Sequence, residues 1–173
     1  MQLKNEHIYL RVPELSDVDS IYEWENCTDN WIINNQHTPL SKEAIIDFAL
    51  SNHDIYSQKQ FRFMIIREND KRLLGCIDLY EFDIKNSKCG VGIFIDQTHR
   101  NKGYGNEALK LLIDYSFSVL HLNQLYAHVP ITNSSSVAIF SKNNFICNGV
   151  FKSWIRGESA NFLDVSFLQR FKD

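Results

Sequence analysis

Residues 99–109 combine two cations with two glycines at the junction between an apolar run and a helix-like segment. The segment reads HRNKGYGNEAL and places Arg100, Lys102, Gly103 and Gly105 in an R-x-x-G-x-G arrangement. The first turn of a helix leaves backbone N–H groups unpaired and carries partial positive charge. Glycines there remove the Cβ atoms that would hold an anion away from the backbone. The pattern therefore has the chemistry of a backbone cradle for phosphate.

The same glycines also fit a simpler interpretation. Gly103 and Gly105 could form only a tight turn between a strand and a helix, because short glycine patterns recur by chance. A Walker phosphate loop is excluded, since it requires Gly-Lys and then Ser or Thr after four intervening residues. A dinucleotide fingerprint is not met either, since its third glycine is missing and its acidic residue would fall within a helix. Taken alone, the motif leaves the turn and the cradle open.

Four further side chains could move protons. Asp78 and Glu81 lie on one expected strand, and Tyr126 and His128 lie on another. Alternation places Tyr126 and His128 on one face of their strand, and Asp78 with Tyr80 on one face of theirs. Each also has an ordinary explanation, such as a solvated carboxylate, a core ring or a hydrogen-bonded imidazole. Spacing does not choose between these, and the candidate catalytic residues are Tyr126, Asp78 and Glu81.

Hydrophobic periodicity predicts the elements that position these residues. Polar caps mark helix starts at Ser16, which is followed by Asp19, and at Ser41 and Asn133, and a further helix spans residues 104–120. Because strand follows strand through short turns, we expect a mixed α/β (α+β) fold with a largely antiparallel sheet. The predicted strands are residues 7–12, 61–66, 73–82, 88–96, 124–131, 145–155 and 161–171.

Length and composition limit the classes of protein. A chain of 173 residues with 44% hydrophobic and 23% charged residues fits one soluble domain, residues 1–173. A net charge of -3 argues against a nucleic-acid partner, which would require a basic patch. The scattered cysteines predict buried free thiols, Cys76 and Cys147 among them, and no metal site. No segment is typical of a signal peptide or membrane span, so we expect a cytoplasmic protein without a membrane partner.

The order of elements and two motifs together resemble the GNAT family of N-acetyltransferases, in particular the branch of ribosomal-protein N-acetyltransferases and spermidine acetyltransferases. The family's R/Q-x-x-G-x-G/A cradle is matched by Arg100, Gly103 and Gly105. Downstream, N-x-x-S-x-x-x-F-x-K-x-x-F from Asn133 to Phe145 is similar to the family's N-x-x-A-x-x-x-Y-x-K-x-G-F. Two motifs at the proper interval are more specific than either alone. The resemblance implies a seven-stranded sheet flanked by helices and splayed between strands four and five.

The resemblance also implies acetyl-CoA as co-substrate, no metal, and direct acetyl transfer to a primary amine. In the family, the gap between strands four and five admits the pantetheine arm, and the cradle takes the pyrophosphate. A backbone N–H of Phe94 or Ile95 would then stabilise the developing oxyanion. The implied cofactor-binding residues are Ile93, Phe94, Ile95, Arg100, Asn101, Lys102, Gly103, Tyr104, Gly105, Asn106, Asn133, Ser136 and Phe140.

Two positions depart from the family pattern. The tyrosine that usually acts as general acid is Phe140 here, and the glutamate that many relatives carry on strand four falls at Gly90. Phenylalanine cannot donate a proton, although a thiolate can also take its proton from water. Two alternatives to a transferase therefore stay open: a module that binds CoA without transferring acetyl groups, and a purely structural or interaction domain.

The acceptor site is expected in the two N-terminal helices, which wall the substrate groove in this family. Carboxylates there would attract a cationic amine and an aromatic wall could hold it, but a solvated acidic face with core tryptophans explains the same residues. The acceptor is expected to be a small polyamine-like amine or a protein N-terminus, and the protein a homo-oligomer. The residues concerned are Glu23, Trp24, Glu25, Asp29, Trp31, Asn34, Asn35 and His37, with Trp154 and Phe162 near the last turn.

Overall fold

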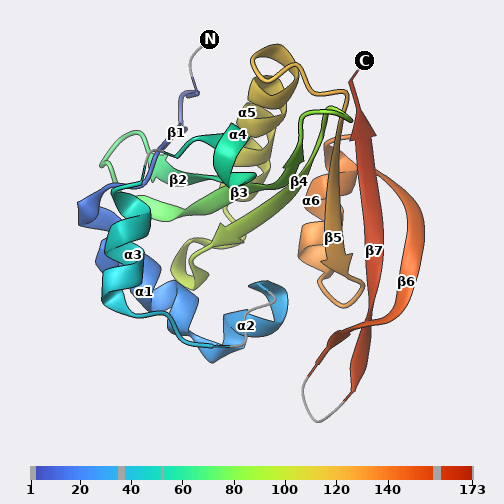
Figure 1. Ribbon diagram of the computed structural model, residues 1–173, viewed down its shortest axis with the longest axis horizontal. Coiled ribbons are helices and arrows are strands. Elements are labelled where there is room, and N and C mark those ends of the chain that lie inside the picture. The colour runs from blue at the N-terminus through green and yellow to red at the C-terminus, as the bar shows by residue number, and fades with distance from the viewer. Residues whose placement is uncertain (1–2, 35–37, 52, 158–160, 173) are drawn as a thin grey trace.

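The computed structural model describes residues 3–34, 38–51, 53–157 and 161–172. Its centre is one sheet of seven strands in the order β1-β2-β3-β4-β5-β7-β6 (Figure 1). Neighbouring strands are antiparallel except β4 and β5, so the predicted mixed, mostly antiparallel sheet is confirmed. The strands are β1 (Ile8–Arg11), β2 (Phe61–Arg67), β3 (Leu73–Asp83), β4 (Lys88–Ile95), β5 (Gln124–Pro130), β6 (Ile146–Arg156) and β7 (Phe162–Phe171).

β4 and β5 stay together over only three residue pairs. The last of these pairs is Gly90 with Tyr126. Beyond it β4 continues to Ile95 and β5 to Pro130, and Figure 1 shows the two strands diverging. The splay expected between strands four and five is therefore present. Backbone groups on the facing edges lose their ladder partners where the strands separate, which leaves them available to a ligand.

Helices cover both faces of the sheet (Figure 1). Side chains of α1 and α3 pack on Met64, Ile66 and Cys76, whereas α5 and α6 share a core with Phe63 and Ile65. The alternation along β2 therefore sorts its apolar side chains between two cores. None of the helices in the described ranges has both the length and the apolar character needed to cross a membrane. The helices are α1 (Val18–Asn26), α2 (Thr28–Asn34), α3 (Lys42–Ala49), α4 (Ile55–Gln58), α5 (Tyr104–Ser118) and α6 (Ser134–Lys142).

The helix starts follow the predicted caps at two of three places. Ser41 and Asn133 each accept the backbone N–H three residues on, at the starts of α3 and α6. At α1 the prediction is wrong: a short 3-10 helix, η1 (Leu15–Asp17), precedes α1, and a capping box joins Glu14 and Asp17 at its start. Asp17 is buried and also accepts two hydrogen bonds from a guanidinium of β1, which holds this turn against the strand. Periodicity did not reveal α2 and α4, since helices of seven and four residues are too short to show it.

All four cysteines are free thiols. Cys76 and Cys89 are buried, and burial raises the pKa of both thiols, that of Cys89 to about 12. Both therefore stay protonated and unreactive at neutral pH. The expected burial of Cys147 is wrong: it is exposed, because β6 is an edge strand with most of its residues facing solvent.

Candidate active site

The loop between β4 and α5 has the backbone shape of an anion cradle. Asn101 and Gly103 both adopt left-handed conformations, with φ of 61° and 86°. Such turns gather backbone N–H groups into a concave nest. α5 begins at Tyr104 with no side chain capping it, so its first N–H groups lack an intrahelical acceptor. A Cβ on Gly103 would meet no atom within 4 Å, which means that conformation requires this glycine and the space beside it is open.

A groove of about 670 Å³ opens beside this loop. It is bounded by the splayed parts of β4 and β5 and by the first turns of α5 and α6. All residues predicted to bind the cofactor line it, except Phe140. Phe140 is 3% exposed and packs edge-on against Phe145, with the ring centroids 5.0 Å apart. An apolar ring gains more from that core than from a polar groove, so the structure places it beneath the site.

Arg100 and Lys102 line the groove but are tied to their own loop. The Nε of Arg100 donates to the backbone oxygen of Ile95 at 2.9 Å, and its guanidinium lies 5.8 Å from the centroid of the Phe94 ring. The Nζ of Lys102 donates to the backbone oxygen of Thr98 at 2.9 Å. Both cations therefore brace the loop and also bring positive charge to the rim of the groove.

Packing behind the groove joins α5 to α6 and to β4. Gly105 is buried, and a Cβ there would lie 3.4 Å from Cδ1 of Ile139 and 3.5 Å from Cγ1 of Ile95. The Nδ2 of Asn143 donates to Oδ1 of Asn106 at 2.9 Å. A side chain at position 105 would therefore begin in ordinary contact with its neighbours, whereas Gly103 supplies the left-handed turn. Of the two glycines in the motif, Gly103 is the one that the backbone conformation requires.

His99 lines the groove although sequence reasoning did not select it. It is 8% exposed, and its Nδ1 has no hydrogen-bond partner among the described residues. Burial lowers the pKa of His99 against the opposing effect of Asp96, so the ring is neutral at neutral pH. A buried ring nitrogen without a protein partner can serve a ligand. Thr132 and Ser135 were also missed, although they flank the predicted Asn133.

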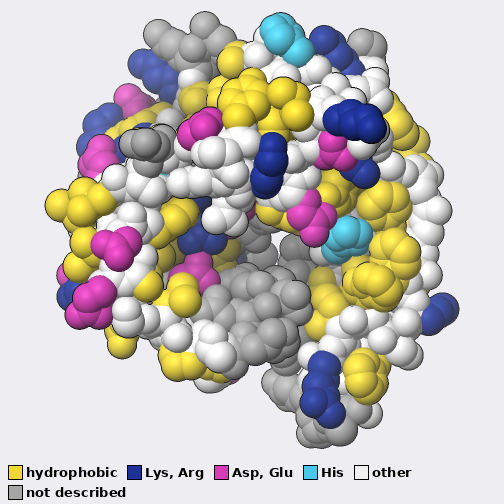
Figure 2. All heavy atoms as spheres, in the orientation of Figure 1, with side chains coloured by type: hydrophobic (Ala, Val, Ile, Leu, Met, Phe, Trp, Pro, Cys, Tyr) yellow, Lys and Arg dark blue, Asp and Glu magenta, His cyan; other side chains and the backbone are white. Residues whose placement is uncertain are grey.

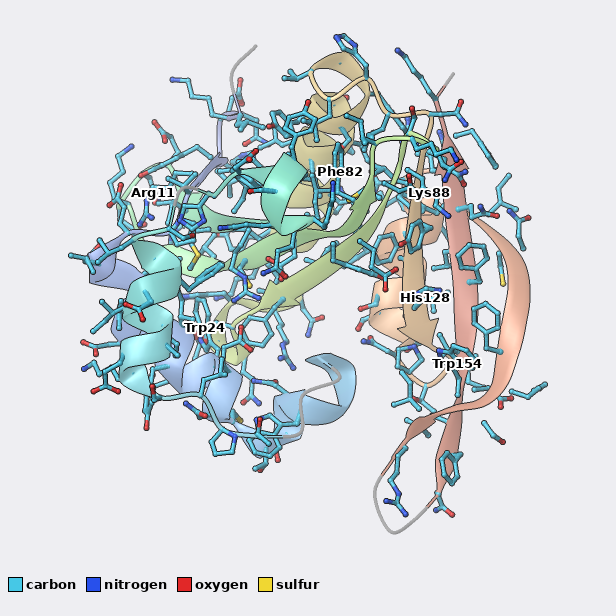
Figure 3. The ribbon with its side chains drawn as sticks, viewed as in Figure 1. Arg11, Trp24, Phe82, Lys88, His128 and Trp154 are labelled. Carbon is cyan, nitrogen blue, oxygen red and sulfur yellow. The ribbon has the colours of Figure 1, made fainter. Side chains whose placement is uncertain are left out.

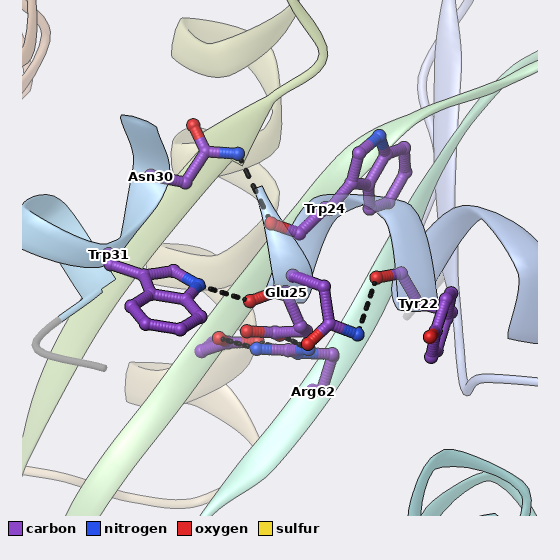
Figure 4. Close-up of polar contacts among 8 residues, drawn as sticks. Tyr22, Trp24, Glu25, Asn30, Trp31 and Arg62 are labelled. Atoms are coloured by element: carbon purple, nitrogen blue, oxygen red, sulfur yellow. Dashed lines mark hydrogen bonds and ion pairs between the residues drawn. The ribbon is translucent and has the colours of Figure 1, made fainter. Parts of the chain in front are cut away.

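Asp78 belongs to an ion-pair cluster with Arg62 and Glu25 on the face of the sheet covered by α1; Figure 4 labels Arg62 and Glu25. Nε and Nη2 of Arg62 each donate to one oxygen of Asp78 at 2.8 Å, and Nη1 donates to Oε1 of Glu25 at 2.5 Å. Burial disfavours the charge on Arg62, but the carboxylates of Asp78 and Glu25 outweigh it and raise the Arg62 pKa. With both oxygens engaged by a fork of N–H donors, Asp78 orients Arg62, and Arg62 in turn holds Glu25 of α1 to the sheet. This geometry differs from the proton-transfer role predicted for it.

The tryptophans of α1 and α2 fix the same region. Nε1 of Trp31 donates to the backbone oxygen of Glu25 at 2.8 Å (Figure 4), and Nε1 of Trp24 donates to Asp96 at 3.2 Å. The carboxylate of Glu25 is already balanced by a guanidinium, and the other two expected carboxylates, Glu23 and Asp29, face solvent. Asn35 and His37, also expected here, lie outside the described residues, and Asn34 is described only by its backbone at the end of α2.

A second hollow, of about 350 Å³, brings together two of the three predicted catalytic residues. Oη of Tyr126 donates to Oε2 of Glu81 at 2.6 Å. Burial raises the pKa of Tyr126, and the hydrogen bond to Glu81 raises it further, so the phenol keeps its proton at neutral pH. No group of three or more His, Cys, Asp or Glu side chains in the described ranges is arranged to hold a metal ion.

A bulge in β3 explains how Glu81 reaches this hollow. Glu81 has a φ of 51°, and the register of β3 against β4 shifts between Tyr80 and Asp83. Regular alternation would send Glu81 to the face opposite Tyr80. The bulge breaks that alternation and re-aims the side chain, so the carboxylate meets Tyr126 on the same side as the Tyr80 ring.

The ring of Tyr80 occupies the place of a side chain at position 90. A Cβ on Gly90 would lie 2.3 Å from Cε2 and 2.4 Å from Cζ of Tyr80. The ring stands edge-on to Tyr126 at a centroid distance of 6.0 Å. Burial raises the pKa of Tyr80 to about 12. A phenol therefore stands where the family pattern has a glutamate, and Gly90 makes room for it.

Comparison with known proteins places this architecture in context. A model of the acetyltransferase (GNAT) domain family matches residues 7–146. The spermidine N(1)-acetyltransferase of Vibrio cholerae is 28% identical over 100 residues, which cover 58% of this chain and 57% of that protein. The putative ribosomal N-acetyltransferase YdaF of Bacillus subtilis is 27% identical over 96% of this chain and 93% of its own length.

A solved structure shares the whole fold. The crystal structure of the Vibrio cholerae spermidine N-acetyltransferase in complex with CoA and spermine superposes with a TM-score of 0.85. The superposition covers 96% of both chains at 23% sequence identity. At this identity the likeness concerns the fold, and it includes a seven-stranded sheet that opens between β4 and β5 in this chain.

Proposed function

The chain belongs to the GNAT acetyltransferase family, and we propose that it transfers the acetyl group of acetyl-CoA to a primary amine. The amine nitrogen attacks the thioester carbonyl carbon, so that a C–N bond forms, the C–S bond breaks and the CoA thiol leaves. The ammonium must lose a proton before attack, and the departing thiolate must gain one. The observation that carries the proposal is the uncapped N-terminus of α5 at the head of a groove between splayed strands.

The groove suits the chemistry of CoA. Its phosphate end would lie on the left-handed turn of Asn101 and Gly103, where free N–H groups and the helix dipole favour anions. Arg100 and Lys102 add charge at the rim, and the Nδ1 of His99 offers one more polar contact. Among the residues that the structure describes, no side chain fills the space beside Gly103.

The splayed strand β4 suits the thioester end. Residues of β4 after Gly90 have no ladder partner on the β5 side among the described pairs, yet Phe94 and Ile95 line the groove. A free backbone N–H of Phe94 or Ile95 would donate to the carbonyl oxygen as negative charge develops on it. We propose this as the oxyanion contact.

We propose Glu81 and Tyr126 for the proton of the attacking amine. Glu81 is an exposed carboxylate at the mouth of its hollow, and Tyr126 holds it in place through a 2.6 Å hydrogen bond. An ammonium at this pair can pass its proton to the carboxylate and on to solvent. Asp78 is better explained as the ion-pair partner of Arg62. Phe140 has no proton to donate and is buried beneath the groove, so we propose that the thiolate takes its proton from water.

The acceptor is proposed to be a small polyamine-like amine or a protein N-terminus. Relatives named for spermidine and for ribosomal N-acetylation support these two classes. A dodecameric structure of the Vibrio cholerae spermidine enzyme supports a homo-oligomer. The four free thiols suit a reducing cytoplasm, which we propose as the location. Light scattering after size exclusion tests the oligomer.

Release of the CoA thiol tests the transfer directly. The protein is incubated with acetyl-CoA and a panel of amines that includes spermidine, simple monoamines and short peptides, and free thiol is followed by its reaction with a disulfide dye. Acceleration by at least one amine supports the proposal. If acetyl-CoA raises the melting temperature but no amine releases thiol, the chain is a CoA-binding module. If CoA leaves the melting temperature unchanged, the cofactor assignment fails as well.

A further inference from the structure

We propose that the hollow beside Glu81 and Tyr126 binds the acceptor and selects a primary monoamine with an apolar body. We call this hollow the amine pocket; Glu81, Lys88, Tyr126, His128, Phe151 and Phe167 lie on its wall. The proposal rests on the proposed function, because it takes the pocket as the acceptor side of that reaction. It narrows the acceptor proposed above to an amine with one ammonium on an apolar body, which sets the polyamine-like class aside.

The wall of the amine pocket is aromatic. The ring of His128 stacks on Phe167 with a centroid distance of 5.3 Å and an angle of 28°. Phe151 lies 5.7 Å from His128 and stacks in turn on Trp154 at 4.8 Å. Figure 2 shows hydrophobic side chains gathered around a histidine in the half of the molecule that holds β5, β7 and β6, and Figure 3 labels His128 and Trp154 in the same half. Such a surface binds apolar groups by removing them from water.

The charges of the amine pocket suit a single ammonium. Glu81 supplies one carboxylate and Lys88 one ammonium, and burial lowers the pKa of His128, so that ring is neutral at neutral pH. The formal charge of the wall is therefore zero. The cluster of Arg62, Glu25 and Asp78 has a net charge of -1, but none of its three residues lies on the pocket wall, and Arg62 engages both carboxylates. An ammonium at Glu81 is matched by one carboxylate, whereas a second ammonium in the pocket would be repelled by Lys88.

The amine pocket lies beside the cofactor groove. On β5 it reaches His128, and the groove reaches Pro130, two residues further along the same strand. Two residues of a strand span about 7 Å. A bound amine at Glu81 and Tyr126 therefore lies within a few ångströms of the point where β4 and β5 begin to separate, at Gly90 and Tyr126. The pocket is placed to present an amine to the groove.

Binding to the CoA-saturated protein tests the substrate class independently of turnover. Titration calorimetry compares 2-phenylethylamine, which has one ammonium and an aromatic body, with spermidine. We expect 2-phenylethylamine to bind at least about tenfold more tightly, because one or two buried carbon groups already give that ratio in an apolar pocket. Equal binding, or tighter binding of spermidine, would overturn the proposal.

Variants locate the binding on the proposed wall. Phe151→Ala is expected to weaken the binding of 2-phenylethylamine about tenfold. Trp154→Ala removes the 61% exposed ring that stacks on Phe151 and so should also weaken it, which keeps the test available if the first variant does not fold. Glu81→Gln is expected to weaken the binding of both 2-phenylethylamine and spermidine. Val150→Ala is the matched control, because its side chain lies next to Phe151 on β6 but is absent from the wall. Unchanged 2-phenylethylamine binding in the Phe151 or Trp154 variant and in Glu81→Gln would refute the pocket.

Thiol release separates the two proposals. If 2-phenylethylamine binds with the expected preference but releases no thiol from acetyl-CoA, the amine pocket stands and the transferase assignment fails. If spermidine is bound and acetylated in preference, the transferase stands and the substrate class fails.

Discussion

Replacement of Gly90 by alanine tests whether the ring of Tyr80 has taken the place of a side chain at position 90. The added Cβ would come within 2.3 Å of Cε2 and 2.8 Å of Cδ2 of that ring. Carbon atoms do not approach so closely, so the ring must move. Tyr80 packs edge-on against Tyr126, and this contact would be lost or strained. Overpacking of this kind costs about 1–3 kcal/mol.

The matched control lies two residues along the same strand and on the same face. A Cβ on Gly92 would meet only Cβ of Asp78, at 3.9 Å, which is an ordinary contact. Both substitutions remove the same backbone freedom from the unfolded chain, so the difference between them isolates the clash. A clash of about 2 kcal/mol, at about 2–4 °C of melting temperature per kcal/mol, should make the melting temperature of Gly90→Ala roughly 4–8 °C lower than that of Gly92→Ala.

A double-mutant cycle decides the cause. In a Tyr80→Leu background, Gly90→Ala should cost little, because the ring that it meets is gone. The coupling should be about 1 kcal/mol or more, as for residues in contact. Equal melting temperatures for the two single alanine variants, or purely additive effects in the cycle, would refute the packing of Tyr80 over Gly90.

Three further changes probe the ion pairs, the half-buried imidazole of His128 and the phenol of Tyr126. Arg62→Met leaves two carboxylates without their partner and should cost roughly 2–4 kcal/mol in urea unfolding, whereas Arg67→Met, at an exposed pair, should cost clearly less; similar losses would contradict the role of Arg62. Burial lowers the pKa of His128 below its ordinary value of 6.5 in the folded chain. As pH falls through 6.5, the unfolded chain therefore takes up a proton on this histidine before the folded chain does, and the free energy of unfolding decreases. His128→Gln should therefore flatten the fall of Tm between about pH 7 and pH 5, with a remaining slope from His99, whose pKa burial also lowers, and an unchanged slope would contradict this. Tyr126→Phe should lower kcat about tenfold or more with little change in KM, and an unaltered kcat would place the proton route elsewhere.

The sheet and the cofactor groove were predictable because they follow local rules. The seven strands show alternation or apolar runs that periodicity detects, and all seven form. The spacing of the glycine motif predicted the turn at Gly103, which has a left-handed φ. The residues next to Gly103 in the chain line the cofactor groove. Where sequence neighbours are also spatial neighbours, residue order predicts the site.

The second hollow was not predictable in the same way. Glu81 meets Tyr126 only because of a bulge, which depends on one residue's φ and not on any pattern of residue types. The contact of Tyr80 with Gly90 and that of Arg62 with Asp78 are made between neighbouring strands, so the strand register decides them. The contact of Arg62 with Glu25 depends on how α1 packs on the sheet. Sequence patterns indicate which residues have the chemistry, and the tertiary contacts decide which of them meet.

The most direct test of the account is the affinity of CoA for the protein with and without the turn at Gly103. Titration calorimetry compares the wild type with Gly103→Val and with Gly149→Val, since a Cβ at either glycine meets no atom within 4 Å but only Gly103 has a left-handed φ and lines the groove. The account predicts that CoA binds the wild type and Gly149→Val alike, and binds Gly103→Val at least about tenfold more weakly, with the fold retained by thermal unfolding. Equal affinity of CoA for Gly103→Val and the wild type would contradict it.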